Sequence, residues 1–240
     1  MTSRNVEEVK KPKSVCILAM GMSNQAYFME AAQRGGLMPY DETWCINAMG
    51  GIVKHDLLFH MDDIRIQERR AEANPESGIS GMLKWMKESD KPIMTSRAHP
   101  EYKTSVDFPL EEVIKCIGIP YFNSTAAYAL AYAIYAGVEK VAIYGCDFTY
   151  PNAHIAESGR GCMEFLIGVA GTRGIEVCLP EMTTLLDKNY GKPSIYGYDT
   201  EQIEIGQGFE VKREPLPEDK WPTAAEMEKR YDHKPKYQEQ

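Results

Sequence analysis

The segment at residues 122–150, FNSTAAYALAYAIYAGVEKVAIYGCDFTY, carries the pattern that decides the fold. A polar cluster at 123–125 precedes an alanine-rich stretch that ends at Gly137, and the apolar run VAIYG follows at 141–145. Asn and Ser are favoured helix N-caps and Gly is a common helix stop, so the segment predicts a helix followed by a buried strand. The alanines are small enough to let this helix lie close to a sheet.

The same alternation runs through most of the chain. Apolar stretches typical of strands recur between segments with helical periodicity. The predicted strands lie at 14–20, 43–47, 56–61, 91–96, 141–145 and 175–179. Strands that are apolar on both faces and alternate with helices indicate a parallel sheet covered on both sides. We therefore predict an α/β, Rossmann-like domain over residues 14–180.

The two ends of the chain differ from this domain. Residues 1–13 form a polar N-terminal segment, and residues 181–240 form a C-terminal extension rich in Pro and charge, with an irregular or hairpin part and one short helix near 223–231. Tyrosines in the extension are consistent with an acceptor groove, a homo-oligomer interface or ordinary packing: Tyr190, Tyr196, Tyr198, Tyr231 and Tyr237.

Composition excludes several classes of protein. The net charge of −8 and the lack of a long Lys/Arg block disfavour broad nucleic-acid binding. Six scattered cysteines without a C-x-x-C pair indicate reduced thiols rather than a zinc site. No apolar run near 18 residues and no signal sequence are present, so we expect a cytoplasmic protein without a membrane span.

Polar residues follow the predicted strands at their carboxyl ends, where ligands bind in parallel sheets. Asn47 ends the second strand and is suited to a base or ribose contact, or to a simple turn. His60, Asp62 and Asp63 end the third strand and are suited to a metal or a ribose hydroxyl. We assign no metal site, and place Asp62 with the nucleotide-binding candidates, together with Asn123 before the alanine-rich helix.

The first turn, AMGMSNQAYF at 19–28, lacks both the dinucleotide fingerprint and the Walker P-loop, which disfavours NAD enzymes and P-loop ATPases. Gly21 followed by Ser23 still exposes backbone N–H groups that suit a phosphate. The alternative is an ordinary strand-to-helix turn in which Ser23 caps the helix.

The loop DFTYPNAHIAESGRG at 147–161 supplies candidate catalytic residues. His154 is a candidate base for an acceptor hydroxyl, or else a surface histidine. Tyr150 and Arg160 are candidates to stabilise a departing phosphate. Asp147 directly follows the predicted strand and is either a catalytic acid group or a cap for the next turn.

Three stretches together resemble a known Rossmann-like group: ILAMGMSNQ at 17–25, WCINAMG at 44–50 and NSTAAYALAYAIYAGVEKVAIYGCDF at 123–148. The group contains bacterial sialyltransferases that use a cytidine monophosphate sugar and 6-hydroxymethylpterin diphosphokinase-like proteins. The first loop differs from the usual pattern because it has no proline.

The resemblance implies nucleotide contacts for a set of residues: Gly21, Ser23, Asn24, Asn47, Ser124 and Thr125. It also implies that a tyrosine after the last strand, here matched by Tyr150, lies near the donor phosphate, and that a histidine is the general base. The choice of His154 for that histidine comes from its position in the chain and not from the resemblance.

These observations favour a glycosyltransferase that moves a sugar from a nucleotide-activated donor, its co-substrate, to a hydroxyl on a glycan, a small molecule or a hydroxylated nucleobase. The alternatives are an ATP-dependent pyrophosphokinase acting on a hydroxymethyl compound, which would need Mg²⁺ held by carboxylates, and a non-catalytic nucleotide-binding module.

Overall fold

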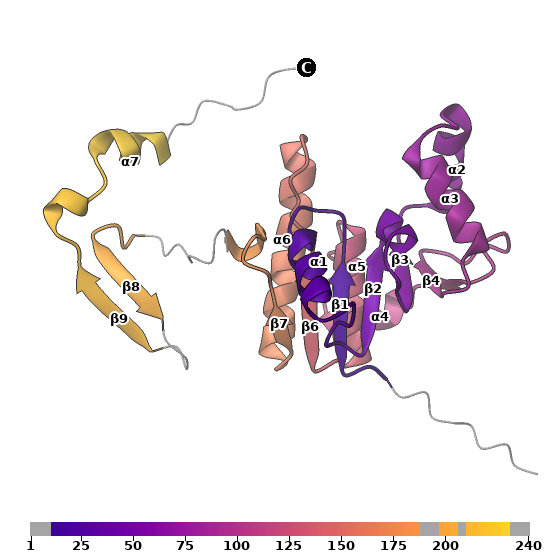
Figure 1. Cartoon of the computed structure of the whole chain (residues 1–240), viewed down its shortest axis with the longest axis horizontal. Helices are drawn as coiled ribbons and strands as arrows, with labels where there is room; N and C mark the ends of the chain where they lie inside the picture. The colour runs from indigo at the N-terminus through magenta and orange to yellow at the C-terminus, as the bar shows by residue number, and fades with distance from the viewer. Residues whose placement is uncertain (1–10, 188–196, 206–209, 231–240) are drawn as a thin grey trace, which may run out of the picture. The chain divides into compact units, whose positions relative to one another are not determined.

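The computed structural model describes residues 11–187, 197–205 and 210–230 (Figure 1). The chain divides into two compact units, Met1–Lys192 and Pro193–Gln240. The strands of the first unit are β1 (Ser14–Leu18), β2 (Glu42–Ile46), β3 (Leu57–His60), β4 (Ile93–Thr95), β5 (Ser105–Asp107), β6 (Lys140–Tyr144) and β7 (Glu176–Cys178). Its α-helices are α1 (Asn24–Gln33), α2 (Ile64–Ala73), α3 (Gly78–Glu88), α4 (Leu110–Ile117), α5 (Thr125–Ala136) and α6 (Ala153–Thr172), with 3₁₀ turns η1 (Asn47–Gly51) and η2 (Leu185–Asp187).

The seven strands form one parallel sheet in the order β5-β4-β3-β2-β1-β6-β7. From β1 the chain builds outward to β5 and then returns through α5 to place β6 on the other side of β1. The order of the strands therefore reverses between β1 and β6, as in a Rossmann-like fold. The predicted fold class is confirmed. The edge strand β5 was not predicted, because its sequence, Ser-Val-Asp, contains a single apolar residue and forms no apolar run.

Successive residues of each strand face opposite layers of helices, as the pleat requires. In β1, Val15 and Ile17 pack in the core that contains α4, α5 and α6, whereas Cys16 and Leu18 pack in the core that contains α1, α2 and α3. Both cores are buried, which explains why the strands are apolar without interruption.

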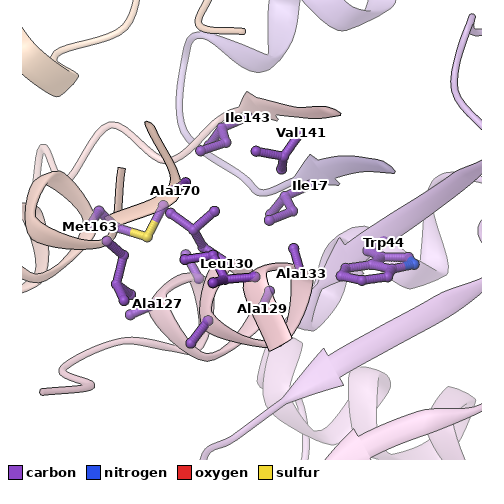
Figure 2. Close-up of a cluster of buried hydrophobic side chains, with 14 of the residues drawn as sticks. Ile17, Trp44, Ala127, Ala129, Leu130, Ala133, Val141, Ile143, Met163 and Ala170 are labelled. Carbon is purple, nitrogen blue, oxygen red and sulfur yellow. The ribbon is translucent and has the colours of Figure 1, made fainter. Parts of the chain in front are cut away.

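Helix α5 packs against α4, α6 and the strands β1, β2 and β3. Figure 2 shows side chains of α5 together with those of α6 and of the sheet. It is buried on several sides, and its fully buried alanines include Ala127, Ala129 and Ala133. The Ser124 hydroxyl caps the helix by accepting a hydrogen bond from the Ala127 N–H, and Gly137 ends it in the left-handed conformation. The small side chains let three neighbours contact one helix.

The second unit contains an antiparallel hairpin, β8 (Glu201–Ile205) and β9 (Val211–Pro215), followed by the short turn η4 (Glu218–Lys220) and α7 (Ala224–Arg230). The hairpin alternative predicted for this region is therefore observed. An ion pair between Arg213 and Glu201 joins the two strands. Of the tyrosines singled out in this region, Tyr198 is described, while Tyr190, Tyr196, Tyr231 and Tyr237 lie outside the described residues, as do residues 1–10. Within the described ranges, no helix combines the length and the apolar character needed to cross a membrane.

Candidate functional site

A cavity of about 460 Å³ lies at the carboxyl edge of the sheet, where the strand order reverses. Its walls come from the segments that follow β1, β2, β3 and β6 and from the first turn of α5. Ligands of open parallel sheets bind at this position because loops and helix N-termini converge there. Many residues proposed from the sequence line the cavity: Gly21, Asn47, Asp62, Asn123, Ser124, Thr125, Asp147 and Tyr150.

The floor of the cavity is formed where the segments after β1 and β6 approach each other closely. The Gly21 N–H donates to the Gly145 carbonyl at 2.8 Å. Gly145 has φ +71°, and a Cβ on it would lie 2.2 Å from the Ala19 carbonyl oxygen. A Cβ on Gly21 would lie 2.6 Å from Asp147 Oδ2. Only glycine fits at these two positions, because any side chain would push the two segments apart.

Asp147 links these segments. Its Oδ2 accepts a 2.6 Å hydrogen bond from the Ser23 N–H, and the Thr184 hydroxyl donates to its backbone carbonyl. The carboxyl group is buried, and its Oδ1 has no hydrogen-bond partner among the described residues. Asp147 therefore fixes the turn between β1 and α1 while leaving one carboxyl oxygen without a protein donor.

Ser23 and Asn24 differ from the sequence-based expectation. Ser23 is fully buried, and its hydroxyl accepts a 2.8 Å hydrogen bond from the Gly145 N–H instead of capping α1. The Asn24 side chain donates to the Ala19 carbonyl at 3.3 Å. The N–H groups of Gly21, Ser23 and Asn24 all donate to protein acceptors. Neither side chain lines the cavity, so both hold the turn in place and the phosphate contact expected of Ser23 is not available.

The first turn of α5 lies in the cavity wall. Thr125 and Ala126 line the cavity, and within the described part of the chain their N–H groups meet no protein acceptor. The first N–H groups of a helix lack intrahelical partners and carry a partial positive charge. Asn123 lies beside them, and its side chain donates to the Ser158 carbonyl at 3.4 Å. This turn can bind a phosphate or another anion.

A chain of polar side chains joins the ends of β2 and β3. Asn47, at φ +50°, accepts a 2.8 Å hydrogen bond from His60 Nδ1 through Oδ1, and its Nδ2 donates to Asp62 Oδ2 at 3.4 Å. His60 is fully buried, and burial lowers its pKa although the Asp62 charge acts in the opposite direction. The imidazole is therefore neutral near pH 7 and orients the Asn47 amide in the cavity wall.

His60 makes stability depend on pH. Its pKa in the folded protein lies below the unfolded value of about 6.5. As the pH falls below that value, the unfolded chain binds more protons than the folded protein. The free energy of unfolding therefore decreases as the pH is lowered, by up to about 1.4 kcal/mol per pH unit for this group. Urea unfolding between pH 7.5 and 5.5 measures this slope. We expect His60→Gln to reduce this slope, and a slope in His60→Gln equal to that of the wild-type protein contradicts the assignment.

The segment after β6 carries the remaining candidates. Tyr150 lines the cavity, and partial burial raises the pKa of its hydroxyl, with a smaller contribution from the charge of Asp62. His154 is exposed in the first turn of α6 and is not part of the cavity wall. Arg160 also lies outside the wall and pairs with Glu164 at 2.8 Å. The predicted loop is shorter than expected because Asn152 caps α6 by accepting from the Ile155 N–H.

The sequence analysis did not identify the aromatic ring of Phe148 as part of the wall. Phe148 has φ +51° and lines the cavity beside Gly159 of α6, where a Cβ would lie 2.6 Å from the ring. Gly159 is visible in the sequence, but only the fold shows that the Phe148 ring lies against it. In the described residues no three His, Cys, Asp or Glu side chains cluster as metal ligands would.

Comparison with known proteins gives matches only among solved structures. No protein-family model matches the chain, and no curated protein matches it. The sialyltransferase CstII from Campylobacter jejuni, in complex with the substrate analogue CMP-3FNeuAc, has 16% identity and a TM-score of 0.46, covering 76% of this chain and 88% of that chain. A CstII structure with cytidine-5'-monophosphate has 15% identity and a TM-score of 0.45, covering 91% of this chain and 99% of that chain.

Proposed function

We propose that the cavity binds a nucleotide with its phosphate at the N-terminus of α5. The observation that supports this proposal most strongly is a pair of N–H groups in the wall of the cavity, on Thr125 and Ala126, for which the described part of the chain supplies no acceptor. A helix start is an anion site, and a cavity of about 460 Å³ is in the range of small-molecule sites.

The segments after β2 and β3 contribute lining residues that suit the nucleoside. The Asn47 amide is held by His60 and can still hydrogen-bond a base or ribose, while the exposed Asp62 carboxylate is an acceptor for ribose hydroxyls. Phe148 and Tyr150 add aromatic surface from the segment after β6. In the proposed site, the N-terminus of α5 binds the phosphate and the segments after β2, β3 and β6 contact the nucleoside.

We infer that the bound nucleotide belongs to an activated sugar and that the protein is a glycosyltransferase. In this reaction the acceptor oxygen bonds to the sugar carbon, the bond from that carbon to the phosphate oxygen breaks, and the acceptor proton passes to a base. The nucleotide leaves as the phosphate that α5 holds. Asp147 is the proposed base, because it lines the cavity and its buried Oδ1 has no hydrogen-bond partner among the described residues. We propose that Tyr150, which also lines the cavity, donates a hydrogen bond to the leaving phosphate.

His154 and Arg160 are not part of this proposal, because neither side chain lines the cavity. Ser23 and Asn24 act through the shape of the turn after β1 rather than by touching the nucleotide.

A second candidate function, pyrophosphoryl transfer from ATP, is favoured by one feature: two carboxylates, Asp62 and Asp147, line the same cavity. Mg²⁺ is commonly held by one or two carboxylates together with substrate phosphates, so the residues fit such an ion. When bound, the ion would neutralise charge on the phosphates. The protein groups would then position the nucleotide through α5 and Asn47.

Isothermal titration with a panel of nucleotides and nucleotide sugars, with and without Mg²⁺, tests the proposal and separates the two functions. Binding of a pyrimidine nucleotide or its sugar conjugate without metal is expected for the glycosyltransferase. Binding of ATP only when Mg²⁺ is present would favour pyrophosphoryl transfer. Failure of every nucleotide to bind would contradict both.

A further inference from the structure

The loop at 96–99 follows β4 at the carboxyl edge of the sheet, next to the cavity. β3 and β4 are parallel neighbours, and His60 pairs with Thr95 in their register. Two residues beyond this pair are Asp62 on one strand, which lines the cavity, and Arg97 on the other. The loop therefore lies beside the cavity wall, on the side away from β1 and β6.

Three side chains hold the backbone of this loop by hydrogen bonds. The Thr95 hydroxyl donates to the Arg97 carbonyl at 2.8 Å, and Asp107 Oδ1 accepts from the Ala98 N–H at 2.6 Å. Ser105 bonds both backbone groups of His99: its hydroxyl oxygen accepts from the N–H at 2.8 Å and its O–H donates to the carbonyl at 3.0 Å. A segment fixed in this way presents its side chains in a defined position.

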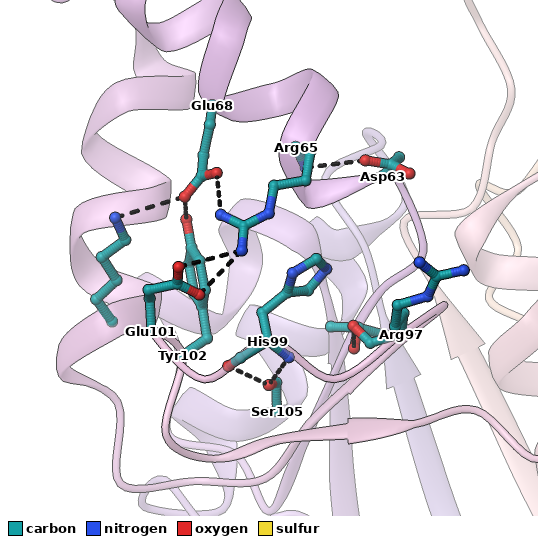
Figure 3. Close-up of polar contacts among 10 residues, drawn as sticks. Asp63, Arg65, Glu68, Arg97, His99, Glu101, Tyr102 and Ser105 are labelled. Atoms are coloured by element: carbon teal, nitrogen blue, oxygen red, sulfur yellow. Dashed lines mark hydrogen bonds and ion pairs between the residues drawn. The ribbon is translucent and has the colours of Figure 1, made fainter.

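The Arg97 side chain is a cation for which the described residues provide no ion-pair partner. Its side chain is exposed, and in the ranges that the structure describes its guanidinium takes part in no ion pair or hydrogen bond. The neighbouring Arg65 differs, because it bonds Glu68 at 2.8 Å and Glu101 at 3.1 Å. Figure 3 shows both the network around Arg65 and the separate Arg97 side chain, which extends from the loop on the same side as that of His99.

The acidic groups near this loop are mostly engaged. Asp63 caps α2 by accepting from the N–H groups of Arg65 and Ile66 at 2.9 and 3.2 Å. Asp107 holds the loop itself, and Glu101 is paired with Arg65. Asp62 remains as an exposed carboxylate in the cavity wall. Among the described residues, Arg97 is therefore an exposed cation without a protein partner, carried on a loop that hydrogen bonds hold in place.

We propose that Arg97 forms a subsite for an oxyanion of the acceptor, either a carboxylate or a phosphate. A guanidinium binds both groups through two parallel hydrogen bonds, and a loop fixed in advance loses little entropy on binding. This subsite rests on the proposed function in one respect only, which is that the bound anion belongs to the acceptor substrate. The cavity would hold the nucleotide and the adjoining loop would select a negatively charged acceptor.

The test compares D-glucuronate, D-glucose 6-phosphate and D-glucose by saturation-transfer NMR titration, with and without saturating cytidine monophosphate. We expect the wild-type protein to bind at least one anionic sugar about tenfold or more tightly than glucose, as a charge-assisted bidentate pair provides. Arg97→Ala should remove this preference and Arg97→Lys should keep part of it. Arg69→Ala, which removes an exposed arginine of α2, should retain it.

The two anionic sugars identify which oxyanion the subsite accepts. Equal binding of all three sugars to the wild-type protein, or a preference that persists in Arg97→Ala, overturns the subsite. If the wild-type protein prefers an anionic sugar but does not bind cytidine monophosphate, the result counts against the proposed nucleotide site and leaves the subsite standing. Nucleotide affinity itself should be equal in the wild-type and Arg97→Ala proteins.

Discussion

The Asp147→Asn variant is expected to bind nucleotide with an affinity close to that of the wild-type protein and to transfer sugar at least 100-fold more slowly. An asparagine oxygen can still accept the 2.6 Å hydrogen bond from the Ser23 N–H, so the turn after β1 keeps its shape. The amide cannot take the acceptor proton, and loss of a general base costs about 10²–10⁴ in rate. Product formation from the best-binding nucleotide sugar measures kcat, and titration calorimetry measures Kd.

Asp62→Asn is the matched control, because it neutralises the other carboxylate in the cavity wall. We expect this variant to weaken nucleotide binding more than it slows turnover. If Asp62→Asn abolishes transfer while Asp147→Asn leaves the rate unchanged, the proton is taken by Asp62 and the assignment of Asp147 is wrong.

The Gly145→Ala variant should lose about 2–5 kcal/mol in its free energy of unfolding. The left-handed backbone at φ +71° costs about 1–2 kcal/mol for a residue with a Cβ. The new Cβ would also lie 2.2 Å from the Ala19 carbonyl oxygen, which forces β1 and β6 apart at the floor of the cavity, and overpacking of this kind costs about 1–3 kcal/mol. Urea unfolding of the variant measures the loss.

Gly35→Ala separates the two contributions. Gly35 also has a positive φ, +67°, but nothing lies within 4 Å of the position its Cβ would take. It should lose only the backbone contribution, about 1–2 kcal/mol. Equal losses in the two variants would show that the contact between Gly145 and Ala19 contributes nothing to stability.

The sheet and the alanine-rich helix were predictable because their signals are local. Uninterrupted apolar runs identify strands buried on both faces, and Ser124 and Gly137 mark the ends of α5. Residues 64–88 form two helices, α2 and α3, separated at 74–77. The location of the site was also predictable, since the carboxyl ends of parallel strands share one edge.

The roles of individual residues were less predictable, because they depend on partners far away in the chain. The Ser23 hydroxyl bonds the Gly145 N–H, 122 positions later, so its position at the start of α1 suggested a cap that the structure does not have. The chain from His60 through Asn47 depends on two strands lying side by side. His154 followed a strand closely in sequence, yet α6 begins at Ala153 and leaves its side chain exposed.

The proposed phosphate site can be tested by removing a single N–H group. Thr125 is the first residue of α5, where proline is tolerated, and Ser124 before it is already extended at φ −160° and ψ 155°, as a residue before proline requires. Thr125→Pro should therefore keep the helix while removing one of the two donors proposed to bind phosphate. Thr125→Ala removes the same side chain and keeps the donor.

Titration calorimetry of the wild-type, Thr125→Pro and Thr125→Ala proteins with the nucleotide that binds most tightly is the most direct measurement. If α5 holds the phosphate, Thr125→Pro weakens binding about tenfold or more, since a hydrogen bond to a charged group contributes about 1.5–3 kcal/mol. Thr125→Ala then stays several-fold closer to the wild-type affinity. Nucleotide binding that is equally tight in all three proteins, with α5 intact by circular dichroism, would contradict the phosphate site at the start of α5.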